Sequence, residues 1–322
     1  MFVGIQYVFA LGGALVCINA ACAQVYPAKP IRMVLPWPPG GSTDATARVL
    51  VPWLTKSLGQ QIIIDNRAGA AGIIGVDIVA KASPDGYTIM LHSATHVANA
   101  TIYSKLPYDT IKDFTAISLV AAQPTILVVN PALPIQSVKE LIAMAKAEPG
   151  RLHYGSGGFG SALHMSAALF SKMAGVNIVH IPYKGGGPAV IALLGGEVQL
   201  LTATVPSVIS LIKTGKLRAL AVCSAKRSNL LPNLPTVAES GLPNYKMDSW
   251  VALFAPAGLS MSIVRRLHNE IERALNSKDV RDGLSQQGME PMPSTQTEVA
   301  GFIQAELKKY ADIIRDSEMR ND

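Results

Sequence analysis

The sequence predicts an α/β protein made of two similar units, and three observations support this class. The chain has 322 residues, of which 49% are hydrophobic and 16% charged, as in a globular protein long enough for two domains. Short β-rich runs alternate with stretches of helical periodicity, and this alternation occurs twice. The order strand, helix, strand predicts a parallel sheet with helices on both faces in each unit. Such sheets bind ligands beyond the carboxyl ends of their strands.

The first 23 residues differ from the rest of the chain. The stretch MFVGIQYVFALGGALVCINAACA contains no charged side chain and ends in Ala-Cys-Ala, a pattern of small residues typical of a cleavage site. Its apolar run from Tyr7 to Val16 is shorter than the roughly 20 apolar residues of a transmembrane helix. We therefore expect residues 1–23 to be a signal peptide that is cleaved after Ala23, and the mature protein to be exported.

Cysteine content and charge restrict the function further. Two of the three cysteines lie in the predicted signal peptide, so Cys223 is alone in the mature chain and no disulfide can form within it. Cys223 belongs to the apolar run LRALAVCS, which predicts a buried side chain and not a nucleophile. The net charge of +6 is spread along the chain, without the Lys/Arg block of nucleic-acid-binding proteins, and it favours small anions.

The first unit begins with the strand-like run IRMVLPW. A helix ending at Leu58 and Gly59 follows, then the strand QIIIDN, a helical stretch over 73–82 and the strand YTIML. Gly59 is a typical residue for the end of a helix. Pro52 falls inside the preceding helix and is expected to kink or restart it.

The second unit begins near Thr125 with the run TILVVN. Its further expected strands lie in LHYGS, VNIVHIPY, VQLLTA and LRALAVCS, and its helices lie over 138–147, over 162–174, from Pro188 and near 207–213. The Pro- and Asn-rich stretch NLLPNLPTVAESGLPNY predicts a connector. After it, we expect the strand WVALFAP and helices over about 261–276, 278–286 and 295–316.

The stretch PWPPGGSTDATAR, residues 36–48, leaves the first strand and enters the first helix. Trp37 and the prolines stiffen the chain. Gly40 and Gly41 allow a tight turn and remove the Cβ atoms that would block approach to the backbone. The first N–H groups of the following helix are unpaired and carry the positive end of the helix dipole, so this junction predicts an anion site made mostly of backbone.

The polar residues of this junction allow more than one interpretation. Ser42 or Thr43 can cap the helix. Asp44 either binds a hydroxyl or amine of a ligand or stabilises the first helical turn by its charge. The whole stretch can also be a capped turn with no ligand.

A second stretch with the same composition, YGSGGFGSALH, spans residues 154–164. It again leads from a strand into a helix through Gly and Ser, so the two junctions can face each other across a cleft and hold an anion between them. The candidate ligand contacts here are Gly155, Ser156, Gly160 and Ser161. His164 either orients this loop or packs and caps within the helix.

A third junction lies in IPYKGGGPAVIALLGG, residues 181–196, where Pro188 suits the first helical position. Tyr183 and Lys184 can add a hydrogen bond and a positive charge to the cleft, although a solvated lysine is an alternative. Ser93 and Thr204, in two other strand-like runs, complete the candidate ligand contacts.

Several enzyme classes lack their motifs. Gly155, Gly157 and Gly160 form G-x-G-x-x-G, but the following strand offers no acidic residue for a dinucleotide ribose. There is no G-K-[ST] and no G-x-S-x-G. His92 and His96 are four residues apart but lack the Glu of H-E-x-x-H, so we expect loop or cleft-lining histidines and not zinc ligands. No catalytic residue, metal or cofactor is expected.

In order and spacing these stretches resemble the Bug family, the TctC-type extracytoplasmic solute receptors of tripartite tricarboxylate transporters. The similarity covers nearly the whole mature chain. It runs from YPAKPIRMVLPWPPGGSTDATAR through LGQQIIIDNRAGAAGIIGVDIVAKASPDGYTIML, YGSGGFGSALH and HIPYKGGGPAVIALLGGEVQ to LPTVAESGLPNYKMDSWVALFAPAG.

The resemblance implies a type II periplasmic binding protein fold, the Venus flytrap, with a ligand cleft between two lobes. Lobe 1 would comprise residues 24–124 plus 246–322, and lobe 2 residues 125–245. The protein would be a periplasmic, monomeric, non-enzymatic receptor that captures a small carboxylate and delivers it to the membrane permease subunits of a tripartite tricarboxylate transporter. Backbone N–H groups and waters of the two Gly/Ser loops would hold the carboxylate.

The ligand class is narrowed by two departures from the family pattern. The family often carries Asp where this chain has Ala192 and Ala203, and losing both carboxylates disfavours a ligand with an ammonium group. Our hypothesis is a plain carboxylate, an aliphatic or aromatic dicarboxylate, with Trp37 covering its apolar body. The alternatives are a periplasmic sensor that binds a signalling partner, and an enzyme on a similar α/β scaffold.

Overall fold

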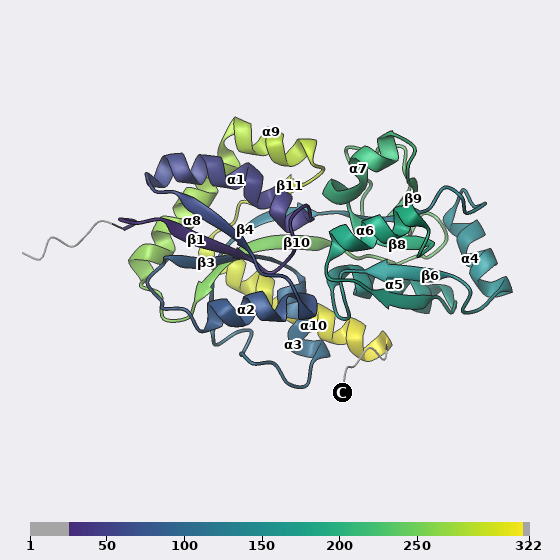
Figure 1. Cartoon of the computed structure of the whole chain (residues 1–322), viewed down its shortest axis with the longest axis horizontal. Coiled ribbons are helices and arrows are strands. Elements are labelled where there is room, and N and C mark those ends of the chain that lie inside the picture. Colours follow the sequence, from purple (N-terminus) through teal and green to yellow (C-terminus); the bar gives the residue numbers. More distant parts are fainter. Residues whose placement is uncertain (1–25, 318–322) are drawn as a thin grey trace, which may run out of the picture.

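The computed structural model describes residues 26–317 and contains two sheets, each with helices on both faces (Figure 1). The predicted signal peptide lies outside the described residues. No described helix combines the length and the hydropathy needed to cross a bilayer. The α/β class and the arrangement in two lobes are confirmed.

The first sheet has six strands in the order β11-β4-β10-β3-β1-β2. Their bounds are β1 (Ile31–Leu35), β2 (Ile62–Asn66), β3 (Thr88–Ser93), β4 (Phe114–Gln123), β10 (Ser249–Pro256) and β11 (Glu290–Pro291). β1 pairs in parallel with β2 and β3, whereas β10 runs antiparallel to both β3 and β4.

The second sheet has five strands in the order β7-β6-β8-β5-β9. Their bounds are β5 (Thr125–Val129), β6 (His153–Ser156), β7 (Val179–Pro182), β8 (Leu200–Thr204) and β9 (Arg218–Val222). β6 pairs in parallel with β7 and β8, and β5 is antiparallel to β8 and β9.

The expectation of two parallel sheets is therefore wrong, since both sheets are mixed. The chain leaves the first sheet at the end of β4, crosses at Pro124 and enters the second sheet with β5. It returns with β10 from that same edge, so β5 and β10 run away from the lobe junction while β1, β3, β6 and β8 run toward it. The carboxyl ends of the parallel strands of both sheets thus meet between the lobes.

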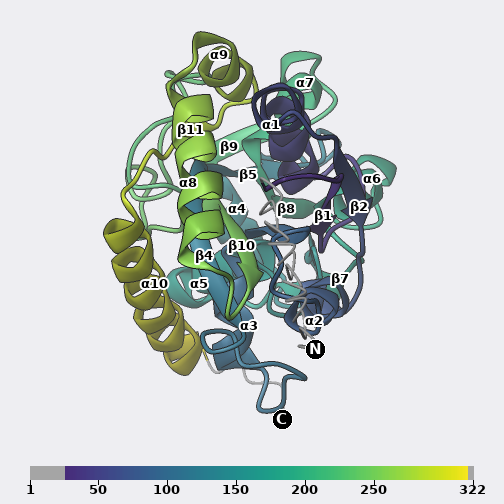
Figure 2. The ribbon, with the colours of Figure 1, turned by 90° about the vertical axis from the view of Figure 1, so that its left-hand side faces the viewer.

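Helices cover each sheet on both faces. Around the first sheet lie α1 (Ser42–Leu58), α2 (Ile73–Ala80), α3 (Thr95–Ile102), α8 (Met261–Asn276), α9 (Lys278–Gln286) and α10 (Gln296–Ser317), with the short 3-10 turn Ala70–Gly72 before α2. In Figure 2, α1 and α9 lie at the top of the view and α2 and α3 at the bottom. One apolar cluster joins β1 to α1 and α8, and a second joins β3 to α2, α3 and α10.

The second sheet is covered by α6 (Gly186–Gly195) and α7 (Val205–Lys213) on one face and by α4 (Val138–Ala147) and α5 (Ala162–Ala174) on the other. The C-terminal α10 packs against α3 of the first lobe and α5 of the second. Cys223 is fully buried and unpaired, as predicted. The division at residues 124/125 and 245/246 stays a prediction.

Helix α1 differs from its prediction at one position. It runs without a break from Ser42 to Leu58 and ends at Gly59 in the left-handed conformation, so the expected restart at Pro52 does not occur. Leu50, Leu54 and Leu58 are buried on one side of the helix, before and after the proline. Because both halves of α1 are held against the same core, the loss of one backbone hydrogen bond at Pro52 does not divide the helix.

Candidate functional site

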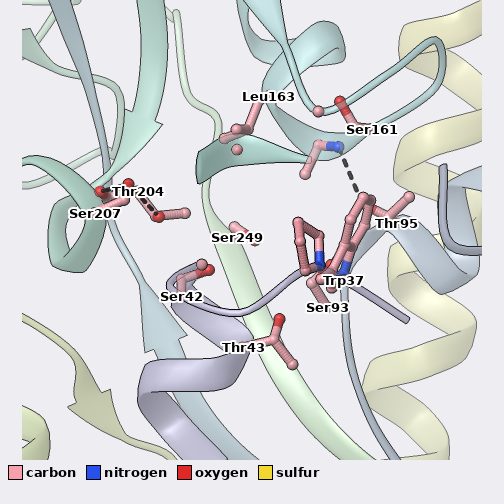
Figure 3. Close-up of a pocket in the computed structure, with 15 residues that line it drawn as sticks. Trp37, Ser42, Thr43, Ser93, Thr95, Ser161, Leu163, Thr204, Ser207 and Ser249 are labelled. Atoms are coloured by element: carbon pink, nitrogen blue, oxygen red, sulfur yellow. Dashed lines mark hydrogen bonds between the residues drawn. The ribbon is translucent and has the colours of Figure 1, made fainter. Parts of the chain in front are cut away.

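A cavity of about 50 Å³ lies between the lobes, where the carboxyl ends of the parallel strands meet (Figure 3). None of the 15 residues that line it carries a charged side chain, and most of its polar side chains are hydroxyls. The cavity is small, and hydrogen bonds between the lobes lie around it. The lobes are thus nearly closed.

The first loop, residues 36–44, brings the start of α1 to this cavity. Gly41 is the N-cap residue and α1 has no side-chain cap, so the predicted capping by Ser42 or Thr43 is wrong. Asp44 instead fixes the loop before the helix, because its Oδ2 accepts a hydrogen bond from the Gly40 N–H at 3.1 Å. Ser42 and Thr43 line the cavity instead, and Figure 3 shows them on the first turn of α1.

Asp44 is buried and its carboxylate is used within the first lobe. Arg48 Nε donates to Oδ2 at 2.7 Å, and Asn66 Nδ2 donates to Oδ1 at 3.4 Å and to the Trp37 carbonyl at 2.9 Å. Burial alone would raise the pKa of Asp44, but the hydrogen bonds from Arg48 and the Gly40 N–H outweigh it and lower the pKa overall. Asp44 therefore anchors the loop and does not line the cavity.

The second loop, residues 155–161, is anchored by neutral groups. Ser161 caps α5 by accepting from the His164 N–H at 3.2 Å, and His164 Nδ1 accepts from the Gly160 N–H at 3.0 Å. The buried Ser156 hydroxyl donates to the Gly158 carbonyl, accepts from the Gly158 N–H, and lies 2.6 Å from His180 Nε2. His164 thus orients the second loop from behind the cavity wall.

The two histidines behind this loop are stacked with their ring centroids 4.0 Å apart. Burial lowers the pKa of His164 to about 3, with a smaller contribution from His180, and burial lowers the pKa of His180 to about 4. Both rings are neutral near pH 7, which leaves His164 Nδ1 free to accept the Gly160 N–H.

Helix N-termini from both lobes point at the cavity. First-turn residues of α1, α3, α5, α6 and α7 line it, namely Ser42, Thr43, Thr95, Ala162, Leu163, Gly186 and Ser207. The first N–H groups of a helix have no partner within the helix and carry the positive end of its dipole. Since no acidic side chain is among the lining residues, the arrangement favours an anion over a cation.

The lobes contact each other around the cavity. The Tyr103 hydroxyl of the first lobe donates to the Phe159 carbonyl of the second at 3.0 Å, and the Ala162 N–H donates to Thr95 Oγ1 at 3.1 Å. A Cβ atom on Gly160 would lie 2.9 Å from Ile102 Cδ1 across the same junction. Gly160 has φ +80°, so glycine serves both the turn and the close approach of the lobes.

The structure brings part of the predicted set to the cavity. The predicted residues that line it are Trp37, Gly41, Ser42, Thr43, Ser93, Ser161 and Thr204. The predicted residues that lie outside its lining are Gly40, Asp44, Gly155, Ser156, Gly160, His164, Tyr183 and Lys184. Tyr183 donates to Glu197 Oε2 at 3.2 Å, and Lys184 is exposed to solvent.

Eight lining residues were not among the predicted ligand contacts. They are Pro38, Thr95, Gly157, Ala162, Leu163, Gly186, Ser207 and Ser249. Ser249 begins β10, and Ser207 donates to the Thr204 carbonyl at 2.7 Å in the first turn of α7. A search for hydroxyls within three residues of each strand–helix junction would have found Ser207 and Thr95.

Two further sequence interpretations need correction. His92 and His96 are neither loop nor cleft-lining residues, because both are almost fully buried on β3 and α3. No cluster of three or more metal-ligating side chains occurs among residues 26–317. Ala192 and Ala203 are also buried and do not line the cavity, so their lack of a carboxylate does not bear on the ligand class.

Residues 46–319 match the family model described as the tripartite tricarboxylate transporter family receptor, TctC. The chain belongs to this family. Among curated relatives, protein BugT of Bordetella pertussis is 41% identical over 297 residues, which are 92% of this chain and 91% of BugT.

Solved structures of similar proteins include two with a bound carboxylate. Rpa4515 of R. palustris, with adipate, superposes with a TM-score of 0.89 and 35% identity, covering 91% of this chain and 98% of that one. MatC from Rhodopseudomonas palustris, with bound malate, superposes with a TM-score of 0.86 and 31% sequence identity, covering 90% of this chain and 100% of that one. These neighbours are solute-binding proteins with carboxylate ligands, as expected for the family.

Proposed function

We propose that this receptor captures a small dicarboxylate between its lobes and delivers it to the membrane subunits of a tripartite tricarboxylate transporter. The observation that carries the proposal is the meeting of five helix N-termini on a cavity without charged side chains. Backbone N–H groups satisfy a carboxylate without a fixed counter-ion, so the complex stays exchangeable and the ligand can be released.

The lining favours a plain carboxylate over an amino acid. An ammonium group needs acceptors and gains most from a carboxylate partner, but the cavity lining offers only hydroxyl and carbonyl oxygens. Adipate and malate, the ligands of the two solved relatives, both lack an ammonium group. We therefore infer an aliphatic dicarboxylate of this type as the ligand.

Trp37 supplies the apolar wall for the carbon chain of the ligand. Its ring lines the cavity and meets the His92 ring edge-on, with centroids 5.7 Å apart, so it is held in place from behind. Because only about 50 Å³ remains in the nearly closed state, an aliphatic chain fits with less opening than an aromatic ring requires.

The test is calorimetric titration of the protein exported from the full 322-residue chain and purified from the periplasm. An intact mass equal to that of a chain beginning at Gln24 would confirm the predicted cleavage. The panel contains adipate, malate, succinate, phthalate, citrate and aspartate. Succinate and aspartate form a matched pair, because they differ only by the ammonium group. We expect one tight ligand at unit stoichiometry and aspartate at least about tenfold weaker than succinate.

The opposite results are equally clear. Absence of heat across the panel, in folded protein free of copurified ligand, would overturn the carboxylate proposal. Chemical conversion of a bound member would show an enzyme instead. Capture of permease subunits from membranes only in the presence of ligand supports delivery, whereas capture of a sensor kinase would support the signalling alternative.

A further inference from the structure

We propose that Thr95 couples ligand binding to lobe closure. It acts as a positioning residue, because donating its hydroxyl to the ligand strengthens the hydrogen bond that its oxygen accepts from the second lobe. This inference rests on the proposed carboxylate-binding function. Thr95 is the first residue of α3 in the first lobe, it is 1% exposed, and it lines the cavity. No sequence motif pointed to it.

The Thr95 oxygen is already used as an acceptor on two sides. The Ala162 N–H, at the start of α5 in the second lobe, donates to Oγ1 at 3.1 Å. The Ser93 hydroxyl, at the end of β3 in the first lobe, donates to the same oxygen at 3.3 Å. Figure 3 draws the first of these as a dashed line across the cavity beside Trp37.

A hydroxyl has two acceptor lone pairs and one donor hydrogen. With both lone pairs occupied, the Thr95 hydrogen remains to be donated, and no hydrogen bond within residues 26–317 uses it. A buried hydroxyl without an acceptor is unfavourable. The cavity is the side on which an acceptor can be added, and a ligand carboxylate oxygen supplies one.

The same contact explains why ligand binding would close the lobes. Donation to an anionic oxygen polarises the hydroxyl and makes its oxygen a stronger acceptor. The Ala162 N–H belongs to the other lobe, so a stronger Thr95–Ala162 hydrogen bond stabilises the closed state relative to the open one. The ligand thereby strengthens the Thr95–Ala162 hydrogen bond between the lobes, even if the ligand itself contacts only the first lobe.

Two variants at this position separate the hydroxyl from the rest of the side chain. Thr95→Val keeps the shape and removes the hydroxyl, whereas Thr95→Ser keeps the hydroxyl. The matched control is Thr101→Val on the same helix, because Thr101 Oγ1 donates to the Ala98 carbonyl within α3 and Thr101 does not line the cavity. Each protein is titrated with adipate and malate, and the tighter ligand is used in the second measurement.

Lobe closure is measured as the distance between spin labels on the exposed positions 272 and 216, introduced as Glu272→Cys and Lys216→Cys, one on each lobe. The native Cys223 is buried and does not compete for labelling. We expect Thr95→Val to bind roughly tenfold more weakly and to lose most of the ligand-dependent shortening, while Thr95→Ser and Thr101→Val stay within about threefold of the parent in affinity and close fully.

The possible failures are distinguishable. If the parent protein binds none of the carboxylates, the proposed function falls and this inference falls with it. If the parent binds and closes, and Thr95→Val matches it in affinity and in label distance, only the role of Thr95 is overturned. The same holds if Thr95→Ser is as defective as Thr95→Val, because the hydroxyl would then not be the relevant group.

Discussion

The two Gly/Ser loops at the lobe junction have similar sequences but opposite kinds of anchor. The first is held by a buried carboxylate, since Asp44 accepts from the Gly40 N–H and pairs with Arg48. The second is held by neutral rings, since His164 accepts from the Gly160 N–H and stacks on His180. The shared motif therefore determines the backbone shape that faces the ligand, whereas tertiary partners decide how each loop is held.

This difference has a consequence for charge near the ligand. The negative charge of Asp44 lies behind the first loop, where Arg48 neutralises it and Asn66 contacts it. The second loop carries no formal charge while its histidines are neutral. An anion between the loops therefore meets N–H dipoles from both sides, and each loop can be weakened independently of the other.

The largest expected effect comes from acid. Burial lowers the pKa of His96 and of His164 to about 3, and that of His92 well below its usual range, so the unfolded chain binds protons below about pH 6.5 that the folded chain does not. Stability should fall as pH drops from about 6.5 toward 3, by about 1.4 kcal/mol per pH unit for each of His96 and His164.

Urea unfolding monitored by tryptophan fluorescence between pH 7.5 and 4.5 checks this slope. Asp44 should contribute little in this range, because above pH 4.5 its carboxyl is mostly ionised in the unfolded chain, with a pKa of about 3.9, as well as in the folded one. A stability that is flat down to pH 5 would show that the histidines are not held neutral and would remove the contrast between the loops.

The next largest change in stability and carboxylate affinity is expected when the anchor of the second loop alone is removed. His164→Ala removes a buried ring and leaves the Gly160 N–H without its acceptor, so we expect a loss of about 3 kcal/mol in stability and weaker carboxylate binding. His164→Asn places an acceptor oxygen where Nδ1 was and should recover part of the affinity. Thermal melts and calorimetric titration of both variants check this, and equal affinity of the two would argue against the Gly160 contact.

A smaller effect is expected for the first loop. Asp44→Ala removes the acceptor of the partly exposed Gly40 N–H and a pair with the largely exposed Arg48, so the cost in stability should be about 1 kcal/mol. Binding should weaken as the loop loses its shape. Asp44→Asn retains an acceptor for Gly40 and should bind better than Asp44→Ala. If both bind like the parent, Asp44 does not position this loop.

The smallest effect is expected at Lys184, which is exposed and lies outside the cavity lining. Lys184→Ala should leave affinity within about twofold of the parent. Titration at low and high salt checks this. A tenfold loss would mean that a side-chain charge contributes to anion capture and that backbone dipoles are not sufficient.

Much of the fold could be predicted because local signals agree with it. The helices over 138–147 and 162–174 were predicted at their observed bounds, since Ser137 and Ser161 cap them and an apolar side marks each. β4 was missed because it joins β5 in one apolar run, with only Pro124 between strands of different sheets. The strand periodicity does not reveal such a crossing.

The site was predictable only in part. Glycine and hydroxyl residues next to helix starts identified both loops, because an anion site made of backbone leaves that local pattern. The partners of the two anchors were not predictable, since Asn66 and His180 reach the loops from other strands. Ser249 comes to the cavity only when the returning strand β10 is assembled, so no local pattern marks it.

We propose that backbone N–H groups of two differently anchored loops hold one carboxylate between the lobes. The most direct test is a crystal structure of the exported protein with its tightest dicarboxylate. We expect a carboxylate oxygen within about 3 Å of N–H groups at the starts of α1 and α5, with no Lys or Arg side chain contacting it. A carboxylate paired with a basic side chain, or bound outside the junction of the lobes, would contradict the proposed binding by backbone N–H groups.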